Sequence, residues 1–215
     1  MSLTVGWLDN GNTRGEFTAS IAKLCAFEAA QGRLVSVARI QSGPLMTEGR
    51  NRLVAAMLNS PAEWLLMVDT DMGFSHDAAA RLLSVADADT HAVVGGLCFG
   101  VNEEHGQFPT LYRSVQGQPA VIFDYKRNGL QDVDATGAAF LLTHRSVFER
   151  YRRDEFDPWF HRRFVLGTER HPGGWLGEDI SWCFHLRDKG VPILVDTRVK
   201  IGHVKSTMVT EHETD

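Results

Sequence analysis

The chain has 215 residues, of which 43% are hydrophobic, and a net charge of −5. This composition supplies enough apolar material for one core, and a single α/β domain is the simplest organisation. The acidic balance gives no overall basic surface, so nucleic-acid binding is not expected. Three widely spaced cysteines with no CxxC pair argue against a disulfide framework or a zinc site.

Targeting and membrane signals are also missing from the sequence. Residues 1–10 lack the basic stretch and long apolar run of a signal peptide. The most apolar run, residues 64–68, is far too short to span a bilayer. We therefore expect a cytoplasmic protein without a transmembrane segment.

The first hundred residues alternate between strand-like and helix-like segments. Apolar and Val- or Ile-rich runs predict strands at residues 3–8, 33–40, 64–68 and 92–96. Helical spacing of apolar residues predicts helices at residues 18–31, 48–58 and about 75–85. A β-α-β-α-β-α-β order of this kind predicts a parallel sheet with right-handed crossovers.

After Gly100 the pattern changes. Residues 110–124 suggest a hairpin that turns near residues 116–118, and a strand and a short helix follow at residues 137–143 and from Ser146. Residues 152–174 are polar and aromatic and are expected to form a surface loop. The last predicted elements are a helix at 178–189 and short strands at 193–195 and 199–201, followed by a flexible tail at 206–215.

The triplet Asp69-Thr70-Asp71 follows the most apolar predicted strand. Ligands of open α/β sheets bind at the carboxyl ends of the strands, so these side chains are expected at a binding edge. Two neighbouring carboxylates repel each other unless a cation lies between them. Oxygen ligands suit Mg²⁺ or Mn²⁺, which keep positions open for phosphate oxygens. The alternative is structural: Asp69 ends a strand and Asp71 caps the next turn.

Two later motifs carry further ionisable side chains. Glu178 and Asp179 begin a predicted helix, where the helix dipole alone favours acids. A carboxylate placed beside an acceptor hydroxyl also serves as a general base. His203 follows a short predicted strand, and its imidazole is either an ordinary surface or core group or a third metal ligand.

Aromatic residues are concentrated just before this helix. They form either a small satellite core or a lid whose rings stack on a sugar or a nucleobase. These residues are Trp159, Phe160, His161, Phe164 and Trp175.

Four segments in this order resemble the GT-A glycosyltransferases, in particular the small inverting enzymes of the family 2 type and related phage-encoded enzymes. The segments are residues 48–54 (EGRNRLV), 64–72 (WLLMVDTDM), 134–142 (DATGAAFLL) and 177–183 (GEDISWC), followed by Gly190, Asp196 and the Gly202-His203 pair. The resemblance covers most of residues 1–205. It implies a mainly parallel central sheet flanked by helices, with a small antiparallel part on the acceptor side.

The resemblance also implies a role for individual residues. Asp71 would bind Mn²⁺ or Mg²⁺ directly and His203 would complete the metal site, while Asp69 would contact the metal or the donor ribose. Asp179 would be the catalytic base of an inverting enzyme, and Glu178 would hold sugar or acceptor hydroxyls. Asp9 would lie near the nucleobase, Arg50 would approach the diphosphate, and Thr70 would lie within the donor site.

The resemblance thus predicts the transfer of one sugar from a nucleotide-sugar, with UDP-sugar favoured, to a hydroxyl of a glycan, protein or small molecule. Residues 1–100 would bind the donor and residues 101–205 the acceptor. Two departures bear on this prediction. The first loop, residues 9–15, is more polar and glycine-rich than is usual in the family. The Gln-x-x-Arg-Trp signature of processive enzymes is absent, so polymer synthesis is not expected.

Three other functions share parts of this pattern. A haloacid-dehalogenase-like phosphohydrolase also has a strand that ends in DxD, with Asp69 as nucleophile, but its motif normally follows the first core strand. A sugar nucleotidyltransferase would use the glycine-containing residues 11–15, but the expected Pro-Lys is missing. A non-catalytic nucleotide-sugar-binding module would not need both acidic motifs and His203.

Overall fold

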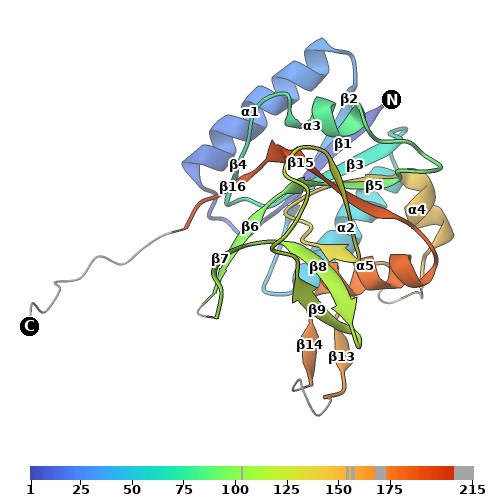
Figure 1. Ribbon diagram of the computed structural model, residues 1–215. Helices are drawn as coiled ribbons and strands as arrows, with labels where there is room; N and C mark the ends of the chain where they lie inside the picture. The colour runs from blue at the N-terminus through green and yellow to red at the C-terminus, as the bar shows by residue number, and fades with distance from the viewer. Residues whose placement is uncertain (103, 154, 156–157, 168–172, 206–215) are drawn as a thin grey trace, which may run out of the picture.

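A seven-stranded mixed sheet forms the centre of the molecule, as a computed structural model shows (Figure 1). The structure describes residues 1–102, 104–153, 155, 158–167 and 173–205, so the predicted tail at 206–215 lies outside it. In spatial order the strands are β10 (Leu130–Val133), β15 (Ile193–Lys200), β5 (Val93–Leu97), β12 (Phe140–His144), β3 (Trp64–Val68), β1 (Leu3–Asp9) and β2 (Leu34–Gln41).

Two strands depart from the predicted parallel order: β10 pairs antiparallel with β15 at one edge of the sheet, and β12 runs antiparallel inside it. Strands β2, β1 and β3 are mutually parallel, but β12 inserts antiparallel between β3 and β5. Strand β5 therefore runs in the same direction as β3 without touching it, and β15 is parallel to β5. The sequence pattern could not reveal this insertion because β12 comes from the second half of the chain.

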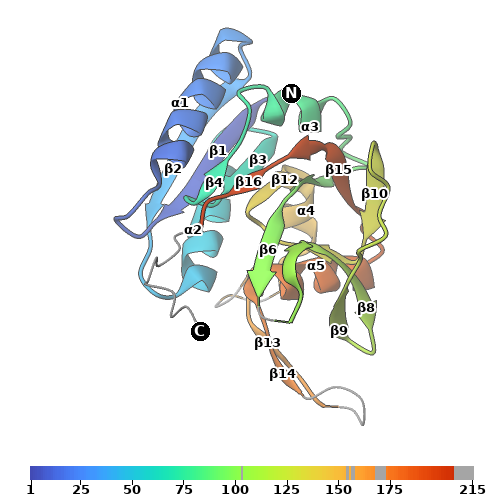
Figure 2. The same ribbon diagram turned by 60° about the vertical axis from the view of Figure 1, so that its left-hand side comes forward.

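The two faces of the sheet are covered by the helices α1 to α5, which are those of the described residues (Figure 2). Along β3, Trp64, Leu66 and Val68 belong to one core cluster while Leu65 and Met67 belong to the other, as a strand with a period of two residues requires. The first cluster packs against α1 (Gly15–Ala30) and α3 (Ala78–Leu83), and the second against α2 (Met46–Leu58), α4 (Arg145–Arg150) and α5 (Glu178–Asp188).

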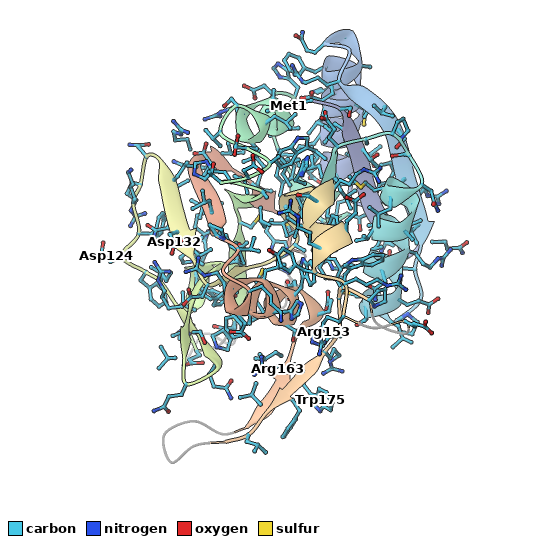
Figure 3. All side chains as sticks on the ribbon, turned by 90° about the vertical axis from the view of Figure 1, so that its right-hand side faces the viewer. Met1, Asp124, Asp132, Arg153, Arg163 and Trp175 are labelled. Carbon is cyan, nitrogen blue, oxygen red and sulfur yellow. The ribbon has the colours of Figure 1, made fainter. Side chains whose placement is uncertain are left out.

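Most predicted elements are present with shifted ends. Of the helix predicted at about residues 75–85, only α3 is helical. The two strands predicted at 193–195 and 199–201 are one continuous strand, β15. The loop predicted at 152–174 contains β13 (Arg163–Val165), which pairs with β14 (Gly174–Leu176) as a hairpin that projects from the body (Figure 3).

Small antiparallel sheets surround one edge of the central sheet. They are β6 (Phe99–Asn102) with β7 (Gly106–Pro109); β11 (Ala135–Thr136) with β8 (Leu111–Val115) and β9 (Gln118–Val121), which is the predicted hairpin; and β4 (Met72–Gly73) with β16 (Gly202–His203). No helix within the described ranges is long and apolar enough to cross a membrane.

Gly96 in β5 gives a test of packing near the carboxyl edge of the sheet. A Cβ atom there would lie 2.9 Å from Ile201 Cγ1 and 3.2 Å from Phe140 Cδ1, and both side chains are buried. We expect Gly96→Ala to lower the free energy of unfolding by about 1–3 kcal/mol through overpacking. Urea unfolding measures this, with Gly15→Ala at the open start of α1 as the control. Equal stability of the two variants would contradict the close packing.

Candidate active site

The DxD segment is held in place by backbone hydrogen bonds from several directions. The amide of Asp69 donates to the carbonyl of Ala139 at 3.0 Å, and that of Arg14 donates to Thr70 at 3.1 Å. A turn closes within the segment, where the amide of Met72 donates to the Asp69 carbonyl at 3.2 Å. Both aspartates are half-buried. The carboxylates thus leave the end of β3 from a fixed backbone, as the sequence predicted for a binding edge.

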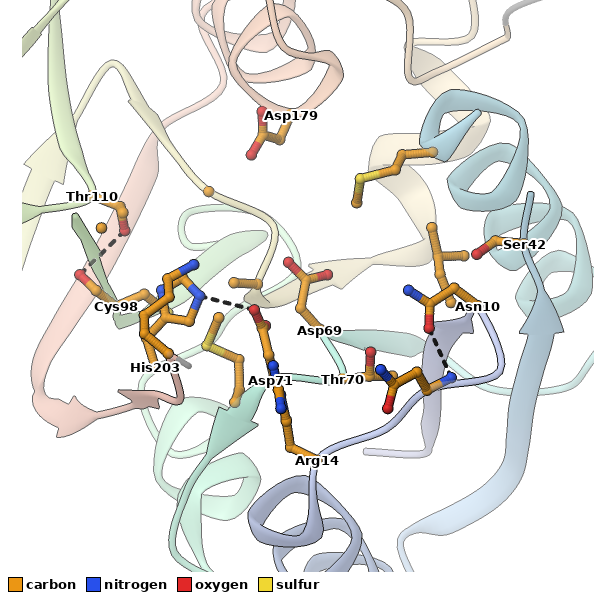
Figure 4. A pocket seen from close by; sticks show the side chains of 18 of the residues that line it. Asn10, Arg14, Ser42, Asp69, Thr70, Asp71, Cys98, Thr110, Asp179 and His203 are labelled. Atoms are coloured by element: carbon orange, nitrogen blue, oxygen red, sulfur yellow. Dashed lines mark hydrogen bonds and ion pairs between the residues drawn. The ribbon is translucent and has the colours of Figure 1, made fainter. Parts of the chain in front are cut away.

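Pairing of β4 with β16 brings His203 to Asp71. His203 lies opposite Met72 in this two-strand sheet, and the amide of Val204 donates to the Asp71 carbonyl at 2.9 Å. Nε2 of His203 lies 2.9 Å from Oδ2 of Asp71 (Figure 4). Nδ1 lies 2.7 Å from the carbonyl oxygen of Phe99, which only accepts, so Nδ1 carries a proton. In the neutral ring Nε2 then has a lone pair to share.

Asp71 and His203 suit a divalent cation. One carboxylate oxygen and one imidazole nitrogen with its other nitrogen fixed by a carbonyl are a usual ligand set. Ligand atoms at right angles on a cation with bonds of about 2.1 Å lie about 3 Å apart, which matches the observed separation. Within the described part of the chain, no three His, Cys, Asp or Glu side chains gather for metal binding. Asp71 and His203 are therefore a pair of candidate ligands, whereas the carboxylate of Asp69 accepts a hydrogen bond from Arg50.

A cavity of about 650 Å³ opens beside this pair. The carboxylates of Asp69 and Asp71 line it from the segment after β3, and Figure 4 shows Asp179 pointing into it from the start of α5. The other lining residues include Asn10, Asn12, Arg14, Ser42, Cys98, Thr110, Gly137, His203 and Lys205. Residues predicted to be donor-side and base-side thus share one cavity.

Asp179 is the carboxylate of the Glu178-Asp179 pair that reaches the cavity. Its Oδ1 accepts from the amide of Ile180 at 2.8 Å, and its Oδ2 accepts from that of Ala138 at 3.4 Å. A Cβ at Gly177 would lie 2.9 Å from Oδ1, so a glycine before the pair leaves room for this carboxylate. Burial raises the pKa of Asp179; Arg50 opposes the shift, whereas the negative charge of Glu178 adds to it.

Glu178 and Arg50 lie behind the cavity wall. Arg50 is 2% exposed, and its Nε donates to Oε1 of Glu178 at 2.9 Å while its Nη2 donates to Oδ1 of Asp69 at 3.2 Å. Neither residue is among those that line the cavity. The resemblance implied that Arg50 approaches a diphosphate and that Glu178 holds hydroxyls of the sugar or acceptor; in the structure the two side chains bind each other.

Asp9 is a buried side chain that holds the first loop by a hydrogen bond and an ion pair. It is 5% exposed, its Oδ1 accepts from the amide of Gly11 at 2.7 Å, and its Oδ2 pairs with Arg39. The hydrogen bond from Gly11 and the contact with Arg39 lower the pKa of Asp9. Asn10, Asn12 and Arg14 of this loop line the cavity, and none of the three was among the residues predicted for the site. The signal for them was the unusually polar first loop.

The aromatic residues before α5 divide into two groups. Trp159, Phe160 and His161 are buried, and Trp159 and Phe160 belong to the main core cluster and not to a separate satellite core. Phe164 and Trp175 are exposed on the hairpin, where their ring centroids lie 5.4 Å apart. Figure 3 shows Trp175 on this projecting hairpin.

Comparison with solved structures identifies the fold. This chain is similar to A197 from STIV, with a TM-score of 0.51 and 15% identity over 100% of both chains. It is also similar to GalNAc-T7, solved with UDP, GalNAc and Mn²⁺, with a TM-score of 0.62 and 11% identity over 95% of this chain. The chain spans only 44% of the length of GalNAc-T7.

A further match is a glycosyltransferase involved in the glycosylation of the major capsid of PBCV-1, with a TM-score of 0.40, 12% identity and coverage of 69% of this chain and 62% of that one. Neither protein-family models nor curated protein sequences match this chain. Its fold is GT-A-like, a mixed α/β architecture with a mostly parallel central sheet flanked by helices and small antiparallel sheets.

Proposed function

We propose that this chain, with its GT-A-like fold, transfers a single sugar from a nucleotide-diphosphate sugar to an acceptor hydroxyl. The observation that carries the proposal is the cavity in which the Asp71–His203 pair and Asp179 meet. The Asp71–His203 pair suits a cation that accompanies a diphosphate, and Asp179 suits the removal of a proton. A site that only bound a nucleotide-sugar would not need a base beside the cation site.

The donor side of the cavity combines charge and polar groups. Three carboxylates would repel a diphosphate, so its binding requires positive charge nearby. Arg14 and Lys205 line the same cavity and supply part of it. Mn²⁺ or Mg²⁺ held by Asp71 and His203 would neutralise the charge that develops on the leaving diphosphate. UDP-sugar is the favoured donor, and the crystal structure of GalNAc-T7, which contains UDP and Mn²⁺, supports this choice.

The acceptor side provides a base in Asp179. Its carboxylate takes the proton of the acceptor hydroxyl while the acceptor oxygen bonds to the anomeric carbon of the donor sugar. The bond between that carbon and the diphosphate oxygen breaks, and the nucleoside diphosphate leaves with the electron pair. Attack from the Asp179 side inverts the anomeric configuration. The raised pKa makes the carboxylate a stronger base than an exposed aspartate.

A thermal-shift panel of UDP-, GDP- and dTDP-sugars with and without Mn²⁺ tests the donor assignment. We expect stabilisation by UDP-sugars that requires Mn²⁺, because only the folded chain assembles the site. The donor is then incubated with the chain, either with an acceptor or with water alone. Release of UDP distinguishes an enzyme from a non-catalytic binding module. If no donor binds with Mn²⁺ and no nucleoside diphosphate is released, the proposal fails.

A further inference from the structure

Arg50 is a fully enclosed cation whose guanidinium nitrogens all have partners. Its Nε binds Glu178 and its Nη2 binds Asp69, as described above. The remaining nitrogen, Nη1, donates to the carbonyl of Ala138 at 3.3 Å and lies 4.0 Å from Sδ of Met67. A guanidinium keeps its proton even when buried, so the positive charge is permanent. The side chain therefore has little capacity left for a ligand in the cavity.

The partners of Arg50 come from parts of the chain with different tasks in the proposed function. Asp69 belongs to the DxD segment, Glu178 begins α5 beside the proposed base, and Ala138 also donates its amide to Asp179. Asp69 and Glu178 are largely enclosed, with side chains 26% and 14% exposed. An enclosed carboxylate without its counterion is costly, so each acid depends on Arg50 for its position.

We infer that Arg50 is a positioning residue that fixes the DxD segment and the start of α5 relative to each other, and that Glu178 is its counterion and not a substrate ligand. This inference rests on the proposed function. It divides the Glu178-Asp179 pair into a structural acid and a reactive acid. Diphosphate recognition then belongs to the cavity-lining cations Arg14 and Lys205.

Arg50→Met tests the role of Arg50, and Arg52→Met on the exposed side of the same helix is the matched control. For Arg50→Met we expect kcat to fall about 100-fold, because a shift of about 1 Å in reacting groups has an effect of that size. The Kd for UDP with Mn²⁺ should stay within about threefold, since no phosphate contact is lost. Arg50→Lys should restore part of kcat, because it keeps the charge but loses the two-sided hydrogen bonding.

Hydrogen exchange supplies a readout that does not need activity. In Arg50→Met the amides of both the DxD segment (69–71) and the start of α5 (178–181) should exchange faster than in Arg52→Met. Glu178→Gln keeps the side-chain shape and serves if Arg50→Met does not fold. We expect it to lower kcat while leaving the acceptor KM within about threefold, as for a group that touches no substrate.

Three results would overturn the inference. One is a loss of UDP binding in Arg50→Met as large as that in Asp71→Asn with kcat preserved, which would make Arg50 a diphosphate ligand. Another is a tenfold or larger rise of the acceptor KM in Glu178→Gln. The third is unchanged exchange at both segments. If the wild-type chain binds no nucleotide, the proposed function fails, but the exchange experiment still decides whether Arg50 joins the two segments.

Discussion

Replacement of Asp179 by Asn is expected to lower kcat by about 10²–10⁴-fold, the range that a general base contributes. Asn has nearly the same shape, and its side-chain oxygen can keep the shorter hydrogen bond, from the amide of Ile180, while the weaker one from Ala138 is lost. The amide does not take a proton from the acceptor, so the loss should appear in kcat while UDP and Mn²⁺ bind as before. Steady-state kinetics and calorimetric titration of UDP measure the two effects separately.

The pH profile gives the same assignment a second test. A base acts only when it is deprotonated, so activity should fall as the pH drops through the pKa of Asp179. Because that pKa is raised, the fall should occur above the ordinary range of an aspartate near 3.8. Arg50 limits the shift, whereas the charges of Glu178 and Asp69 increase it. The acid limb should disappear from the residual activity of Asp179→Asn.

Asp188→Asn, on the same helix and exposed, is the control for both measurements. It should keep the wild-type kcat and acid limb. A variant Asp179→Asn with near-wild-type kcat would remove Asp179 from the reaction. Asp179 would then have only the helix-start role that the dipole explains.

The second large effect is expected from Asp71→Asn. This change replaces one of the two proposed metal ligands by a neutral amide, which binds divalent cations more weakly than a carboxylate. The Mn²⁺-dependent part of UDP binding should fall at least 10-fold, and the thermal shift with UDP and Mn²⁺ should nearly vanish. Binding of UDP without metal should change little or improve, because one negative charge leaves the cavity.

Asp89→Asn serves as the control here, since Asp89 is exposed and lies in the turn that follows α3. His203→Ala should weaken Mn²⁺-dependent binding in the same direction as Asp71→Asn. Full Mn²⁺ dependence in both Asp71→Asn and His203→Ala would show that the cation binds elsewhere, and the pair would then be a simple hydrogen bond.

The first half of the fold, residues 1–100, was largely predictable because its signals are local. The apolar run of β3 predicts a buried strand, and the acids that follow it predict a binding edge. The same reasoning located α5 and its two acids. Local patterns fail where pairing is distant and short: β4 and β16 have two residues each, yet they place His203 beside Asp71. The resemblance to a family, and not periodicity, supplied that partnership in advance.

The fate of Arg50 shows a different limit of sequence reasoning. An arginine in the first turns of a helix usually extends toward solvent or a ligand. Its burial here follows from carboxylates that arrive from β3 and α5, which no local pattern reveals. Likewise, Asn10 and Asn12 line the cavity from a loop in which Asp9 accepts a hydrogen bond from Gly11, and no local pattern predicts where such a loop lies.

The pairing of β4 with β16 has a consequence for folding. Asp71 and His203 are 132 positions apart, so their meeting closes a loop that contains most of the second half of the chain. Contacts of such sequence separation form late, after local structure is in place. A cation held by Asp71 and His203, as proposed, would act as a cross-link between these two distant parts of the chain, and Mn²⁺ would stabilise the pairing of β16 with β4 by mass action.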